Sequence, residues 1–159
     1  MRVQLEHVRL ALDPDVPVFV DFDRLGDEAF GLLARVVLEP DVRLASAALR
    51  LCAHLQGEGA ISVLDLGVRN RNPILREAAA IALGQRSDHP PQMLVRLLTD
   101  PEVAVRARAL EAVGGKSRAA RLRYVRVLRR LHREDPDPRV RAMARQAFPV
   151  ARGRPRMFS

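Results

Sequence analysis

The sequence lacks tryptophan altogether, and its 159 residues include one tyrosine, one lysine and one cysteine. So few aromatic rings offer little surface for stacking a nucleobase, which argues against enzymes that extrude and modify bases. A single cysteine excludes a disulfide within the chain. Because Cys52 lies in the apolar run ALRLCAHL, we expect its thiol to be a small buried group of the core.

Features that would mark a membrane protein or an enzyme are also missing. No run of about 18 apolar residues is present that would span a bilayer, and MRVQLEHVRL lacks the pattern of a signal peptide, so we expect a cytoplasmic protein that does not enter a membrane. There is no P-loop, dinucleotide-binding glycine pattern or nucleophile elbow, and the histidines are not spaced for a helical metal site. The expectation is a protein that is not an enzyme and holds no cofactor.

Positive charge is abundant but confined to one end of the chain. The net charge is +8, yet residues 1–100 contain 11 arginines and 14 acidic residues, whereas residues 101–159 contain 16 basic and 5 acidic residues. Such asymmetry predicts an anionic partner at the C-terminal end, either a nucleic acid or an acidic protein surface. Hydrophobic residues make up 48% of the chain, which is enough for the core of one domain.

A repeat with a period near thirty residues organises the apolar residues. An arginine marks each unit. Pro40, Pro73 and Pro138 lie three residues before it in three units, with Val103 in the other, and Asn70, Asp100 and Asp135 lie six residues before it, with Val37 departing in the first unit. Such residues are expected where a side chain caps the first amides of a helix and proline presets its first turn. The arginines are separated by 33, 30 and 35 residues, in the segments EPDVRLASAALRLC (39–52, Arg43), NPILREAAAIALG (72–84, Arg76), DPEVAVRARALEAVG (100–114, Arg106) and DPDPRVRAMARQAF (135–148, Arg141). Each segment predicts a helix whose alanines allow a neighbouring helix to approach closely.

Second segments with helical periodicity lie between these helices, at residues 61–69, 91–100 and 117–133, and glycines occur near the turns. Each unit is therefore predicted to consist of two antiparallel helices.

The segments NPILREAAAIALG and DPDPRVRAMARQA resemble the first helix of HEAT repeats, particularly the short repeats of the phycobilisome-lyase-like kind, and the resemblance covers residues 24–148. It implies an all-α fold, namely a short right-handed α-solenoid of HEAT-like helical hairpins. It also implies an inter-repeat polar ladder that includes Asp100 with Arg106 and Asp135 with Arg141. The anchor arginines are accordingly interpreted as structural, since buried charges need partners.

Three regions follow from these patterns. Residues 1–23 do not repeat the unit, and VPVFVDF (16–22) alternates apolar residues with the period of a strand, which predicts a non-helical N-terminal arm or hairpin cap. Residues 24–149 form the HEAT-like repeat domain. Residues 150–159 form a basic C-terminal tail.

The segment 117–133 carries the densest positive charge. On a helical wheel its apolar side chains gather on one side, and its arginines gather on the other. The apolar set is Tyr124, Val125, Val127, Leu128 and Leu131, and the opposite set is Arg123, Arg126, Arg129, Arg130 and Arg133, flanked by Arg118. The HEAT resemblance implies that second helices line the concave side, where partners dock. The face is interpreted as a surface that recognises anions, with a solvated face as the alternative.

The tail contains Arg152-Gly153-Arg154-Pro155, which resembles the core of an AT-hook, a minor-groove ligand. The alternatives are a partner-binding peptide ending in Met157 and Phe158 and a disordered tail. Arg152, Arg154 and Arg156 are the candidate binding residues of this segment.

The leading hypothesis is a non-enzymatic HEAT-repeat scaffold that binds an acidic protein partner through its concave, C-terminally basic face. The alternative is a nucleic-acid-binding module that uses the arginines of residues 118–133 and the RGRP tail. A lesser alternative is a bilin-lyase-like or other enzyme on a HEAT scaffold. The sequence does not identify the partner or the oligomeric state.

Overall fold

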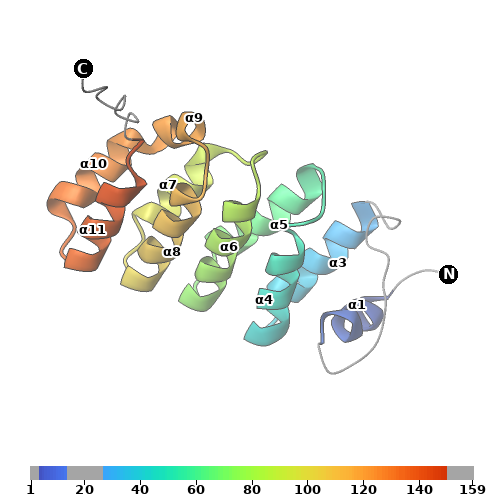
Figure 1. Ribbon diagram of the computed structural model, residues 1–159. Coiled ribbons are helices and arrows are strands. Elements are labelled where there is room, and N and C mark those ends of the chain that lie inside the picture. Colours follow the sequence, from blue (N-terminus) through green and yellow to red (C-terminus); the bar gives the residue numbers. More distant parts are fainter. Residues whose placement is uncertain (1–3, 14–26, 150–159) are drawn as a thin grey trace, which may run out of the picture.

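The computed structural model describes residues 4–13 and 27–149, and every regular element within these ranges is a helix (Figure 1). The elements are α1 (Leu5–Leu12), α3 (Asp27–Val37), α4 (Val42–Leu51), α5 (Glu58–Val68), α6 (Pro73–Gln85), α7 (Pro91–Leu98), α8 (Val103–Gly114), α9 (Arg118–Arg121), the 3-10 turn η1 (Leu122–Tyr124), α10 (Val125–Glu134) and α11 (Pro138–Ala147). The all-α prediction is therefore confirmed for the described residues. None of their helices is long and apolar enough to cross a membrane.

Side-chain caps set where three of the repeated helices begin. The carboxylates of Asp41 and Asp137 and the amide oxygen of Asn72 accept hydrogen bonds from backbone amides in the first turns of α4, α11 and α6. Pro73 and Pro138 occupy the first turn of α6 and α11, where no intrahelical donor is lost. The Asp/Asn and Pro pattern read from the sequence therefore has a direct structural origin.

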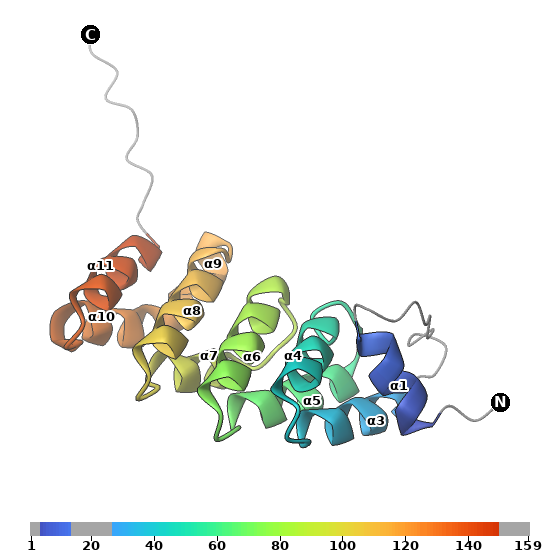
Figure 2. The same ribbon diagram turned by 90° about the horizontal axis from the view of Figure 1, so that it is seen from below.

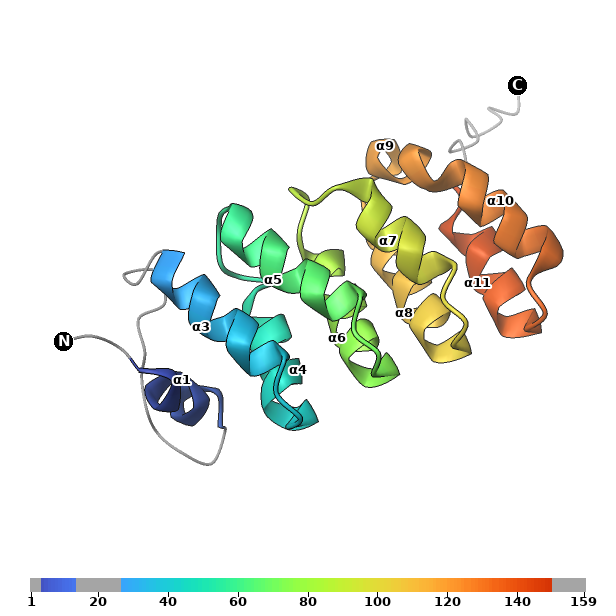
Figure 3. The same ribbon diagram turned by 180° about the vertical axis from the view of Figure 1, so that it is seen from behind.

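The helices form two layers. Helices α4, α6, α8 and α11 pack side by side in chain order as the first layer, and α3, α5, α7 and α10 lie behind them as the second layer. Figure 3 shows the second layer toward the viewer, and Figure 2 shows the row running from α1 at one end to α11 at the other. Each pair thus contacts mainly the pairs before and after it in the chain.

One apolar core extends along the whole row, from Val8 of α1 to Ala147 of α11. Small residues keep the helices close together. A Cβ added to Gly67 of α5 would lie 2.6 Å from Cδ2 of Leu49 and 3.1 Å from Cβ of Ala79, so this position in α5 has no room for a side chain. Cys52 is fully buried, which confirms its predicted place in the core.

The prediction of a non-helical N-terminal arm is wrong for residues 5–12, which form α1. Leu5, Val8 and Leu12 recur at helical spacing, and Val8 is completely buried where α1 packs against α3 and α4. The strand-like alternation and the prolines that argued against helix begin only after this segment. Residues 14–26, which contain VPVFVDF, and the tail 150–159 lie outside the described residues.

Candidate binding site: the arginine face of the last helical pair

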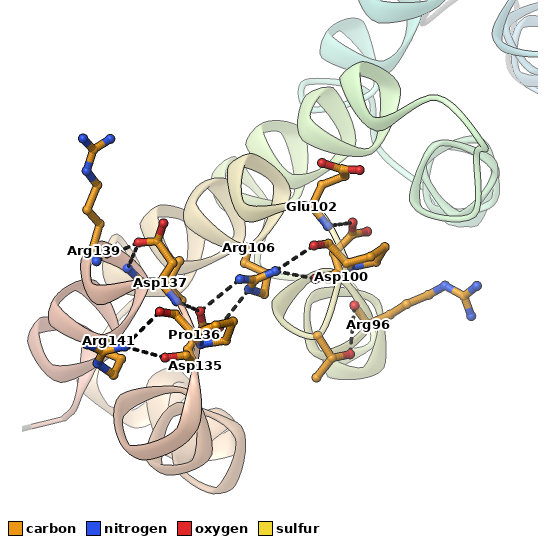
Figure 4. A network of polar contacts seen from close by, with 12 residues as sticks. Arg96, Asp100, Glu102, Arg106, Asp135, Pro136, Asp137, Arg139 and Arg141 are labelled. Carbon is orange, nitrogen blue, oxygen red and sulfur yellow. Dashed lines mark hydrogen bonds and ion pairs between the residues drawn. The ribbon is translucent and has the colours of Figure 1, made fainter.

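Two of the anchor arginines are neutralised by the following helical pair. Nε and Nη2 of Arg76 donate to the two carboxylate oxygens of Asp100 at 2.7 and 2.8 Å. Nε and Nη2 of Arg106 bind Asp135 in the same way at 2.8 and 2.9 Å (Figure 4). The Arg106 and Asp135 side chains are only 8% and 3% exposed. Such two-pronged, charge-assisted contacts fix the register of neighbouring pairs and leave these arginines unavailable to a partner.

The pairing differs from the one that the HEAT resemblance implied. Arg106 reaches the Asp100 of its own unit only through the backbone carbonyl, to which Nη1 donates at 2.9 Å, and Arg141 reaches the carbonyl of Asp135 likewise at 2.7 Å. The carboxylate partner comes instead from the next unit. Within the described ranges, no carboxylate pairs with the guanidinium of Arg141. Arg43 pairs in the opposite direction, with Asp13 after α1, at 3.0 and 3.2 Å.

The predicted helix over residues 117–133 is interrupted. It starts at Ser117, whose hydroxyl accepts a hydrogen bond from the amide of Ala120, but after α9 the chain tightens into the 3-10 turn η1 before α10 begins. A 3-10 turn rotates the chain further per residue than an α-helix does. Tyr124 is nevertheless only 2% exposed and Val125 and Val127 are half-buried, as the helical wheel predicted. Leu122, which is not in the wheel's apolar set, is 59% exposed. Leu128 and Leu131 are buried as the helical wheel predicted.

The arginine face consists of six side chains that are all exposed to solvent: Arg118, Arg123, Arg126, Arg129, Arg130 and Arg133. Among the described residues, only Arg130 has an acidic partner in this set. Its Nε lies 3.5 Å from Oε2 of Glu134, and both side chains are largely exposed, so the contact contributes little. The structure thus brings the six predicted residues onto one segment with their charges almost uncompensated.

Nearby acidic residues do not neutralise the face because they are engaged elsewhere. Asp135 is buried against Arg106. The carboxylate of Asp137 caps α11 by accepting hydrogen bonds from the backbone amides of Arg139 and Val140, at 2.7 and 3.2 Å. Glu134 therefore remains the one neighbouring acid within the described segment 117–149 that contacts the arginine face.

Arg96 is a further basic residue that the sequence reasoning missed. It is exposed on α7 and lines a cavity of about 410 Å³ together with the Arg76–Asp100 pair. Arg130 lines a cavity of about 260 Å³ beside the Arg106–Asp135 pair. The two arginines therefore occupy corresponding places in successive units. The available sequence signal was that each directly precedes a buried leucine, Leu97 or Leu131.

The remaining predicted binding residues, Arg152, Arg154 and Arg156, lie outside the described residues. In the ranges 4–13 and 27–149, no group of three His, Cys, Asp or Glu side chains gathers as a metal site would require.

No family model matches this chain, and no curated protein matches it either. Among solved structures, the chain is similar to the crystal structure of an engineered protein that was a Northeast Structural Genomics Consortium target. The sequence identity is 18% and the TM-score is 0.48, and the alignment covers 89% of this chain and 68% of the engineered one.

Proposed function

We propose that this protein is a cytoplasmic, non-enzymatic HEAT-like α-solenoid that binds an acidic surface of another protein through the arginine face. The observation that carries the proposal is the row of exposed guanidinium groups on α9, η1 and α10, which have almost no carboxylate partners within the described residues. Guanidinium groups bind carboxylates through two parallel hydrogen bonds, so such a row suits an acidic surface. The right-handed solenoid and the concave position of this face belong to the same proposal.

A protein partner is favoured over a single-stranded nucleic acid by the placement of the aromatic residues. Tyr124 is buried, and Phe30 and Phe148 are half-buried against the core, so the described residues offer no exposed phenol or phenyl ring on which bases could stack. Leu122, in contrast, is 59% exposed and lies between Arg121 and Arg123. An exposed apolar side chain next to arginines in the sequence suits a protein–protein interface.

The test reverses the charge of the face. Arg123→Glu, Arg126→Glu and Arg130→Glu are combined in one variant, and a control combines Arg35→Glu, Arg50→Glu and Arg71→Glu, which are exposed arginines on other elements. Both variants change the net charge equally. Affinity purification after nuclease treatment should recover a stoichiometric protein with the wild type and the control but not with the face variant. Recovery of the same protein with the face variant would contradict the proposal.

Nucleic-acid binding is the second candidate, because uncompensated arginines also suit phosphates. Duplex DNA and RNA are titrated into the wild type at about 50 mM and about 200 mM salt. Affinity that falls steeply with salt and is lost in the face variant would favour this candidate. Absence of binding at the lower salt concentration would eliminate it.

A further inference from the structure

A second polar site lies away from the Arg–Asp contacts, between the loop joining α6 to α7 and the loop joining α8 to α9. It is a cavity of about 270 Å³, and the residues important here are Arg86, His89, Lys116, Ser117, Arg123 and Tyr124. Cationic and hydroxyl side chains from loops about thirty residues apart thus line one hollow. None of its residues belongs to the Arg76–Asp100 or Arg106–Asp135 pairs.

Tyr124 carries an unused hydrogen-bond donor in this cavity. The residue is only 2% exposed, yet its hydroxyl makes no hydrogen bond with any described residue. The oxygen is not among the fully buried polar atoms that lack a partner, so it keeps contact with solvent and can donate to water or to a ligand. Burial raises the pKa of Tyr124, so the phenol stays protonated and remains a donor at neutral pH. The cavity is therefore lined by a residue whose hydroxyl no described residue binds and which can donate a hydrogen bond to a ligand.

Lys116 supplies a cation held in place by the backbone. Its Nζ donates to the carbonyl oxygens of Leu83 and Arg86, at 3.0 and 2.7 Å, at the end of α6. An ammonium group has three donors, so one hydrogen remains for a ligand. Because the chain contains a single lysine among 27 basic residues, the compact ammonium occurs at this site alone.

His89 and Arg86 complete the lining with different roles. Nδ1 of His89 lies 3.1 Å from the carbonyl oxygen of Pro90, which accepts only, so Nδ1 carries the hydrogen and Nε2 is an acceptor. Burial lowers the pKa of His89 and keeps the ring neutral. The guanidinium of Arg86 is already bound by the carboxylate of Asp88 at 2.6 and 2.9 Å and therefore serves the fold.

We propose that this cavity binds the phosphate group of a small ligand, with Lys116, Ser117, Arg123 and Tyr124 as donors. Donors from separate loop and helix positions suit a tetrahedral oxyanion better than a planar carboxylate, which offers two oxygens in one plane. The volume admits phosphate with a small organic group and falls below that of most drug-sized sites. This inference does not depend on the proposed binding of an acidic protein.

The single tyrosine makes the test selective. Because the chain has no tryptophan, its intrinsic fluorescence reports on Tyr124 alone. The full-length protein is titrated with inorganic phosphate and, separately, with glycerol 3-phosphate, against sodium chloride at matched ionic strength. We expect a saturable change in emission with at least one phosphate compound and none with chloride. Tighter binding of glycerol 3-phosphate would identify a phosphomonoester as the ligand, and equal or tighter binding of inorganic phosphate would identify the free anion.

Variants then test the residues by calorimetry. Tyr124→Phe removes the hydroxyl and keeps the ring, and we expect phosphate affinity to fall by about tenfold because a hydrogen bond to a charged group is lost. Arg145→Gln, exposed on α11 and outside both the cavity and the arginine face, should bind as the wild type does. If Tyr124→Phe does not fold, Arg123→Gln takes its place with the same expectation. No saturable signal with either phosphate compound, or unchanged affinity in the cavity variant, would overturn the proposal.

Discussion

Arginine side chains act in two distinct ways in this protein, and burial separates them. Arg106 is nearly inaccessible and binds Asp135 through two hydrogen bonds, whereas Arg126 and Arg129 are exposed and have no acidic partner among the described residues. A buried guanidinium without its carboxylate would remain desolvated and uncompensated. The buried arginines therefore stabilise the fold, and the exposed ones are available for binding.

Replacing Arg106 should be far more damaging than replacing an exposed arginine of the same helix. We expect Arg106→Leu to lower the free energy of unfolding by about 3–5 kcal/mol, because Asp135 is left as a buried unpaired charge. Arg108→Leu, which removes exposed ion pairs, should cost less than about 1 kcal/mol. Urea unfolding monitored by circular dichroism measures both. Adding Asp135→Leu to Arg106→Leu should recover part of the lost free energy of unfolding, because no unpaired charge then remains buried. If the double variant instead loses a further amount of about 3–5 kcal/mol, this account is contradicted.

His89 should make stability depend on pH in the mildly acidic range. Burial holds the pKa of His89 below its ordinary value of 6.5, so the unfolded chain binds a proton that the folded chain does not as pH falls below about 6.5. The free energy of unfolding should therefore decrease from about pH 7.5 to about pH 5.5. Thermal melting of His89→Asn should show a shallower decrease, while the exposed His54→Asn should match the wild type. Equal slopes in all three proteins would refute the prediction.

At the scale of the helices, close packing rather than helix propensity decides which positions accept a side chain. Gly31 and Gly67 both lie inside helices, where glycine is intrinsically unfavourable. A Cβ at Gly31 would meet no atom within 4 Å, whereas one at Gly67 would meet Leu49 at 2.6 Å. The same substitution should therefore have opposite effects at the two positions.

We expect Gly31→Ala to raise the free energy of unfolding by about 0.5–1 kcal/mol, because it restricts the unfolded chain without a clash. Gly67→Ala should lower it by about 1–3 kcal/mol, because Leu49 is fully buried and has little room to move. Denaturant unfolding of the two variants measures the difference. A stabilised Gly67→Ala protein would show that α4 and α5 adjust more easily than the structure indicates.

At the scale of the whole molecule, stability should vary along the row. Helices α6 and α8 each pack against first-layer neighbours on both sides, whereas α1 packs mainly against α3 and α4 at one end. In an array where each unit contacts mainly its neighbours, opening an end unit breaks the packing contacts with one neighbour and not with two. The free energy of opening is therefore lowest at the ends.

Hydrogen exchange should show this gradient directly. We expect amides of α6 and α8 to exchange most slowly and those of α1 to exchange faster, as measured by mass spectrometry of peptides from the intact chain. In Arg106→Leu, exchange should accelerate most in α8, α10 and α11, because that pair joins α8 to the turn before α11. Uniform acceleration over the whole chain would indicate a single cooperative unit instead.

Much of the local structure was predictable from the residues. The Asp/Asn and Pro positions located the starts of α6 and α11, and the wheel for residues 117–133 located the exposed arginines. The helix at residues 5–12 was missed because the prolines and alternating residues that follow it were extended to the whole N-terminal region. The partner of Arg106 could not be predicted either, since Asp135 lies 29 residues away and only the packing of successive pairs brings the two together.

The sequence by itself determined the helical content, the repeated unit and the positive charge near the C-terminus, because these depend on spacing and composition within a few turns of chain. Only the tertiary structure decided which charges are neutralised. Burial pairs Arg76 and Arg106 with carboxylates of the following units and engages Asp135 and Asp137 away from the arginine face. Helix packing also brings Tyr124 and Lys116 into the lining of one cavity. Pairing of charges depends on distances and dielectric surroundings that are set when helices far apart in the chain pack together.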